Sequence, residues 1–80
     1  MSPEQCRAAR AWLNWSQAAL AKAASVSAST VKDFETGRRE PTRNNLAAMK
    51  AALERGDVAF WETDGASGIS RPKDGKYAGS

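Results

Sequence analysis

The chain has 80 residues, a net charge of +3 and no histidine. This length fits one domain, because single domains typically hold about 50–200 residues, and it excludes a two-lobed catalytic scaffold. One cysteine excludes an internal disulfide, and without histidine a zinc finger or His-based triad is excluded as well. No acid–base pair or activated nucleophile is recognisable. We therefore expect no enzymatic activity and no cofactor.

The same composition bears on where the protein works. No apolar run approaches the ~20 residues of a membrane span, and no charged leader precedes an apolar signal segment. The single cysteine fits a reducing compartment. We expect a cytoplasmic protein with no membrane contact, whose modest positive charge is compatible with an anionic partner.

The first predicted helix covers residues 3–13. Ser2 can cap it, Pro3 suits the first helical position, and Gln5 lies three residues after the cap. This spacing is a capping box. Asn14 tolerates the left-handed backbone conformation in which many helices end.

Two short helices follow, over residues 17–24 and 28–36. Ser16 and Ser27 stand where helix caps are favoured, and Gly37 stops the second helix. A fourth helix is predicted for residues 43–54, after a loop that ends in proline, because a proline disfavours helix in the residue before it.

Beyond Gly56 the hydrophobic period changes to that of strands. Residues 58–61 and 68–71 are predicted to form a β-hairpin with a longish loop, and residues 72–80 read as a disordered tail. The chain is therefore predicted to have three parts: a helical domain over residues 1–56, a hairpin segment over residues 57–71 and a tail over residues 72–80.

The two short helices have the apolar pattern of a helix-turn-helix pair. Leu20 and Ala24 share one face of the first, Val31 and Phe34 share one face of the second, and Val26 lies in the turn. This spacing packs the two helices across a corner and leaves the other face of the 28–36 helix polar. Cys6 is expected at the surface of the first helix or half-buried.

At these residues the chain resembles the Cro/repressor-type, or xenobiotic-response-element, helix-turn-helix family. The matching residues are Gln17, Leu20, Ala21, Val26, Ser27, Thr30, Val31, Phe34, Glu35, Gly37, Arg38, Arg39 and Pro41. Ser25 stands where the family usually has glycine. The resemblance implies a mostly α fold: a four- to five-helix lambda-repressor-like domain, here with a short C-terminal β-hairpin, in a small bacterial or mobile-element protein.

The resemblance also implies a binding surface for double-stranded DNA, with the 28–36 helix in the major groove. Lys32 can donate to a guanine, and Asp33 can accept from a cytosine amino group. The residues expected to contact DNA are Ser16, Gln17, Ala28, Ser29, Thr30, Lys32, Asp33, Arg38, Arg39, Arg43 and Asn44.

Some charged residues have an alternative interpretation. Arg38 and Arg39 can equally be solvated loop charges, and Asp33 is more often an exposed helix residue than a base contact. Lys32 can also be a solvated helix charge, although the motif favours contact with DNA. Arg10 and Glu35 resemble the family's buried ion pair, which gives them a structural role.

The weak positive charge of the candidate DNA surface points to a homodimer. Residues 28–43 hold four basic and three acidic side chains, and affinity for DNA grows with the number of phosphate contacts. Two copies double those contacts and match an inverted repeat. The hairpin offers a dimer surface through Val58, Phe60, Trp61 and Ile69.

Two functions remain open at this point. The first is a homodimeric transcription regulator, such as a repressor, that acts through its own concentration on an inverted-repeat operator. The second is a protein-binding module on the same fold, an antitoxin or antiactivator, that seizes a partner through the hairpin, Trp12 and Trp61.

Overall fold

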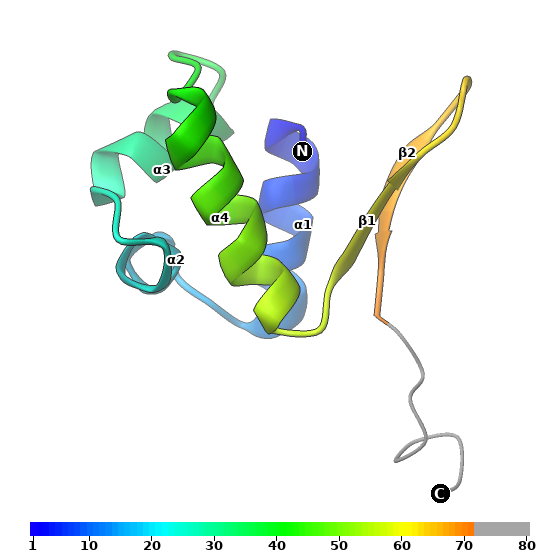
Figure 1. Cartoon of the computed structure of the whole chain (residues 1–80), viewed down its shortest axis with the longest axis horizontal. Coiled ribbons are helices and arrows are strands. Elements are labelled where there is room, and N and C mark those ends of the chain that lie inside the picture. The colour runs from blue at the N-terminus through cyan, green and yellow to red at the C-terminus, as the bar shows by residue number, and fades with distance from the viewer. Residues whose placement is uncertain (72–80) are drawn as a thin grey trace, which may run out of the picture.

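The computed structural model describes residues 1–71, which form four helices followed by an antiparallel hairpin (Figure 1). The elements are α1 Pro3–Leu13, α2 Gln17–Ala24, α3 Ala28–Glu35, α4 Arg43–Arg55, β1 Ala59–Glu62 and β2 Ser67–Ser70. The mostly α fold class with a C-terminal hairpin is confirmed. The tail predicted for residues 72–80 lies outside the described residues. In the described part of the chain, no helix is long and apolar enough to cross a membrane.

Each helix begins at a side-chain hydroxyl that stands outside its first turn. Ser2, Ser16, Ser27 and Thr42 each accept a hydrogen bond from the backbone N–H three residues later. Such a bond satisfies one of the donors that a helix start leaves unpaired. These caps explain why the predicted helix starts are correct.

The helix ends use the left-handed backbone conformation, but not always at glycine. Asn14 and Ser25 adopt φ of 59° and 58°, and Gly37 adopts 76° after α3. At the end of α4 the positive φ falls on Asp57 instead of Gly56. Gly56 serves a different purpose, because a Cβ there would lie 2.7 Å from Cδ1 of Leu13. Its lack of a side chain lets the end of α4 approach α1 closely.

The core lies where the four helices meet. Its largest fully buried side chains are Cys6, Leu20, Val31, Phe34, Met49 and Leu53. Four buried alanines lie beside them, at Ala9, Ala21, Ala24 and Ala52. Small side chains at these positions let helix backbones approach closely, which suits a chain with few large apolar residues. The core therefore fixes α3 against both α1 and α2.

The hairpin lies on the opposite side of α4 from α2 and α3 (Figure 1). Phe60 pairs with Ile69 and Trp61 pairs with Gly68. Phe60 and Ile69 pack against the core, while Trp61 on the other face is 44% exposed. Val58 was predicted on the first strand and in the dimer surface. It instead precedes β1 and is 3% exposed, because it fills the core below the hairpin.

Candidate nucleic-acid interface

The outer face of α3 is polar and open. Ala28, Ser29 and Lys32 are exposed, and Thr30 and Asp33 are half-buried. The hydroxyl of Ser27, which caps the helix, lies 2.8 Å from Thr30 Oγ1 and 3.1 Å from Ser29 Oγ. Hydroxyl groups, which can both donate and accept hydrogen bonds, therefore cluster at the N-terminal turn of α3, and the exposed Lys32 follows further along the helix.

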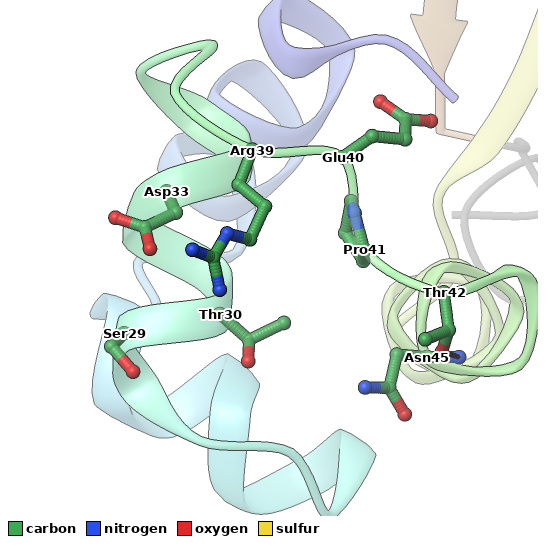
Figure 2. Close-up of a pocket in the computed structure, with 8 residues that line it drawn as sticks. All are labelled: Ser29, Thr30, Asp33, Arg39, Glu40, Pro41, Thr42 and Asn45. Atoms are coloured by element: carbon green, nitrogen blue, oxygen red, sulfur yellow. Dashed lines mark hydrogen bonds between the residues drawn. The ribbon is translucent and has the colours of Figure 1, made fainter.

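A pocket of about 230 Å³ separates α3 from the start of α4 (Figure 2). It is lined by Ser29, Thr30, Asp33, Arg39, Glu40, Pro41, Thr42 and Asn45. In Figure 2 the side chain of Arg39 extends from the loop into this pocket towards α3. Its wall combines hydroxyl, amide and guanidinium groups with two carboxylates, so it is suited to polar partners.

The loop between α3 and α4 is held by backbone hydrogen bonds. The N–H groups of Arg38 and Arg39 donate to the carbonyl oxygen of Asp33 at 2.9 and 3.3 Å. Both arginine side chains are exposed, as are Arg43 and Asn44 in the first turn of α4. Three guanidinium groups thus lie on the loop and helix start that flank α3.

The N-terminus of α2 brings Ser16 and Gln17 to the surface near the end of α1. The hydroxyl of Ser16 is occupied as a cap, since it accepts from the N–H of Ala19 at 2.9 Å. The side chain of Gln17 faces inwards, where its Nε2 donates to Glu35 Oε1 at 3.0 Å. The groups that this helix start offers an anion are therefore its first-turn backbone N–H groups.

Glu35 is buried and its carboxylate is fully engaged. Arg10 donates from Nε to Oε2 at 2.7 Å and from Nη2 to Oε1 at 2.8 Å. The resemblance to the family predicted this pair, and the structure confirms it. Burial alone would raise the pKa of Glu35, but hydrogen bonds from Arg10, Gln17 and Cys6 outweigh it and hold the pKa below its ordinary value.

Cys6 belongs to this buried network, which corrects the expectation of a surface or half-buried residue. Its side chain is fully buried, and its Sγ donates to Glu35 Oε2 at 3.2 Å. Burial and the nearby carboxylate raise the pKa of the thiol to about 12. Cys6 faces inwards because α1 turns this side towards the C-terminal end of α3.

The network joins three helices at one point. Arg7 donates to the backbone carbonyl of Glu35, and Arg10 also donates to the carbonyl oxygen of Trp15 at 2.9 Å. Together with Gln17 and Cys6, these bonds tie α1 and α2 to the last residue of α3. Because such bonds are directional, they set the orientation of α3 and of the polar face that it presents.

The charge of the candidate surface is weakly positive. Lys32, Arg38, Arg39 and Arg43 oppose Asp33 and Glu40, since Glu35 is neutralised by Arg10. Within the described residues, no group of three or more His, Cys, Asp or Glu side chains is placed to hold a metal ion. The surface therefore offers hydrogen bonds and a modest positive field.

A capped pair of short helices, packed at a corner with the second helix open to solvent, is the architecture of a helix-turn-helix DNA-binding domain. The helix-turn-helix family model matches residues 7–57 of the chain. The chain belongs to this family, the Cro/repressor-type helix-turn-helix proteins, and carries a DNA-binding domain of the kind found in transcription regulators. No curated protein matches the chain.

Several residues of this region escaped the sequence interpretation. Glu40, Pro41, Thr42 and Asn45 line the pocket beside α3, but they were not among the residues expected to contact DNA. The bonds of the Gln5 amide to the hairpin and of the Gln17 amide to Glu35 had no signal in the sequence, because these partners lie in other elements.

Proposed function

We propose that the protein is a homodimeric transcription regulator that binds an inverted-repeat operator through α3. One observation carries the proposal most directly. The outer face of α3 exposes Ala28, Ser29 and Lys32, while the buried network around Glu35 fixes the orientation of the helix. A polar helix face held rigidly and left open is suited to the major groove.

In this arrangement the residues of α3 read bases. Lys32 donates to guanine O6 or N7, and Asp33 accepts from a cytosine amino group. Ala28 and Thr30 contact thymine methyl groups, and Ser29 adds a hydrogen bond. These side chains are short except for Lys32, so the helix must lie deep in the groove.

Residues outside α3 position the domain on the phosphates. Arg38 and Arg39 in the loop, with Arg43 and Asn44 at the start of α4, contact one side of the groove. Ser16 and Gln17 contact the other side through the first-turn N–H groups of α2. None of these contacts depends on base identity, so they supply affinity and register.

We infer a dimer because each copy carries few cationic side chains and two copies double the number of phosphate contacts. Two protomers related by a two-fold axis present two copies of α3 to half-sites about one helical turn apart. We place the interface on the hairpin, centred on the exposed indole of Trp61, with Phe60 and Ile69 at its edge. Val58 is excluded from this interface because it is buried within the protomer.

A second function is favoured by the exposed tryptophans. Trp12 is 45% exposed and Trp61 is 44% exposed, and exposed aromatic side chains are enriched at protein interfaces. In this alternative the domain is an antitoxin or antiactivator that binds a partner protein through these residues. A regulator needs the outer face of α3, whereas a sequestering module needs only the exposed side chains of Trp12 and Trp61.

Selection of bound duplexes from a randomised DNA pool, with purified protein at moderate salt, tests the proposal. Enrichment of an inverted repeat is the expected result. If the folded protein enriches no sequence, the proposed function is wrong and the partner-binding alternative takes its place.

A pair of lysine variants then assigns the reading to α3. Lys32→Ala removes an exposed side chain, so the fold remains and binding to the selected site weakens by about 1–3 kcal/mol. The matched control is Lys22→Ala, at an exposed position of α2, which should keep the preference for the selected bases. Equal base preferences for Lys32→Ala and the wild-type protein would contradict a base-reading role.

A further inference from the structure

The side chain of Gln5 links the start of α1 to the hairpin. Gln5 is 4% exposed. Its Oε1 accepts a hydrogen bond from the backbone N–H of Ser2 at 2.8 Å. Its Nε2 donates to the carbonyl oxygens of Trp61 at 3.3 Å and Gly68 at 2.9 Å. One buried amide thus serves two purposes, as a helix cap and as a clamp on two strands.

The clamp acts on a paired position of the hairpin. Trp61 and Gly68 are opposite each other in β1 and β2, so a single donor group holds both strands. Within residues 1–71, Gln5 makes the only side-chain hydrogen bonds between a helix and a strand. The other contacts are the apolar packing of Phe60 and Ile69 and the ammonium group of Lys50, whose Nζ lies 6.0 Å from the centre of the Phe60 ring. Apolar contacts are not directional, whereas hydrogen bonds are.

The same helix holds α3. Cys6, Arg7 and Arg10 all bond to Glu35, and they lie within five residues of Gln5 on α1. A helix rises 1.5 Å per residue, so the two sets of bonds are less than about 10 Å apart along the axis. Thus α1 connects the face that binds DNA to the element that is proposed to form the dimer.

We propose that Gln5 is a positioning residue that fixes the orientation of the hairpin and thereby determines which half-site spacing the dimer accepts. This inference rests on the proposed function, because it requires a dimer formed through the hairpin. The separation of the two copies of α3 is set by how each protomer holds its own hairpin. An isolated two-stranded hairpin is only marginally stable in water, so its orientation depends on this attachment.

The two roles of Gln5 can be separated by one substitution. A capping box accepts Glu as readily as Gln, so Gln5→Glu keeps the bond to the N–H of Ser2. A carboxylate has no donor for the carbonyl oxygens of Trp61 and Gly68, so the clamp is lost. The matched control is Ser2→Ala, which removes the hydroxyl that accepts from the N–H of Gln5 but leaves both donors of the clamp in place.

The experiment measures binding to inverted repeats whose two half-sites are moved apart or together one base pair at a time. The wild-type protein and Ser2→Ala should prefer one spacing by about tenfold or more over its neighbours, because one base pair rotates a half-site around the duplex. Gln5→Glu should reduce this preference to about threefold or less, through the loss of two hydrogen bonds. Affinity for a single half-site should be the same in all three proteins.

Amide hydrogen exchange in the free proteins provides a second readout. Gln5→Glu should speed exchange in β1 and β2 while leaving α2 and α3 unchanged, whereas a general loss of stability would speed exchange throughout. If Gln5→Glu does not fold, Gln5→Met replaces it, because methionine fills a similar volume without a buried charge.

The outcomes separate this inference from the proposed function. If the wild-type protein binds no inverted repeat at any spacing, the proposed function is wrong and the inference falls with it. If the wild-type protein and the folded Gln5 variant show the same sharp spacing preference, the proposed function stands and Gln5 has only a structural role.

Discussion

Arg10 balances the buried carboxylate of Glu35 with two hydrogen bonds. Replacing it by methionine leaves that charge with only the neutral donors of Gln17 and Cys6. Removal of one partner of a buried pair is costly, so Arg10→Met should lower the free energy of unfolding by about 3 kcal/mol. Urea titration measures the loss. The control is Lys22→Met, an exposed lysine on α2, which should change stability little; equal losses would contradict the prediction.

Glu35 also makes the free energy of unfolding depend on pH in the acid range. Its pKa in the folded protein is below the ordinary value of 4.5 that applies when the chain is unfolded. The stabilisation is therefore fully present above pH 4.5 and is lost as pH falls through the folded value. Unfolding free energies measured between neutral and acid pH should fall less steeply for Glu35→Gln than for the wild-type protein. Parallel curves for the two proteins would contradict this origin.

The buried thiol of Cys6 should resist alkylation. Its pKa is about 12 in the folded protein, so at pH 8 its thiolate fraction is about a thousandfold below that of a free cysteine. Mass spectrometry of iodoacetamide-treated protein should show slow labelling that becomes fast in urea. Fast labelling of the native protein at pH 8 would show that the C-terminal end of α3 opens readily from α1.

The residues of this network were predictable only in part. Arg10 and Glu35 were predicted from a family resemblance, since charged residues 25 positions apart carry no local signal of contact. The bonds from Cys6 and Gln17 to Glu35 were not predicted, and Gln5 was recognised only as a helix cap. The missing partners are fixed by how α1 and α2 pack on α3 and how α1 packs on the hairpin. Burial of polar groups depends on tertiary packing, which local patterns do not report.

At the scale of single elements, the turn between α2 and α3 carries backbone strain. Ser25 adopts φ 58° and ψ 42°, a left-handed conformation that costs a residue with a side chain about 1 kcal/mol. Ser25→Gly should therefore raise the free energy of unfolding by about 0.5–1 kcal/mol. Thermal unfolding measures the gain. Ser25→Ala keeps a Cβ in the same conformation and should give no gain; a gain as large as that of glycine would contradict strain as the cause.

The helices were predicted within one residue, whereas the hairpin strands were displaced by one residue towards the turn. Helix starts depend on caps such as Ser27 and Thr42, which are local in sequence. The hairpin depends on its turn, where Thr63 and Ala66 exchange backbone hydrogen bonds at 2.7 and 3.4 Å around an Asp-Gly pair. That pair is a strong signal for a two-residue turn, and it was read only as part of a longer loop.

At the scale of the whole molecule, the positive charge is weak, so affinity for DNA depends on a small number of phosphate contacts. The observed binding constant falls with salt in proportion to the number of phosphates neutralised. Arg43 is exposed in the first turn of α4, beside the candidate DNA surface. In a dimer, Arg43→Gln removes one contact from each protomer, so the slope of log K against log salt should become shallower by about two.

The control for this experiment lies on the same helix. Lys50 of α4 has its Nζ 6.0 Å from the centre of the Phe60 ring, towards the hairpin and away from α3. Lys50→Gln should therefore leave the salt slope unchanged, although it removes the same charge. Titration of the selected duplex at four or more salt concentrations gives both slopes.

A change of about one for Arg43→Gln would indicate that a single protomer binds the DNA. Equal changes for the two variants would mean that net charge, and not a contact on the α3 side, drives binding.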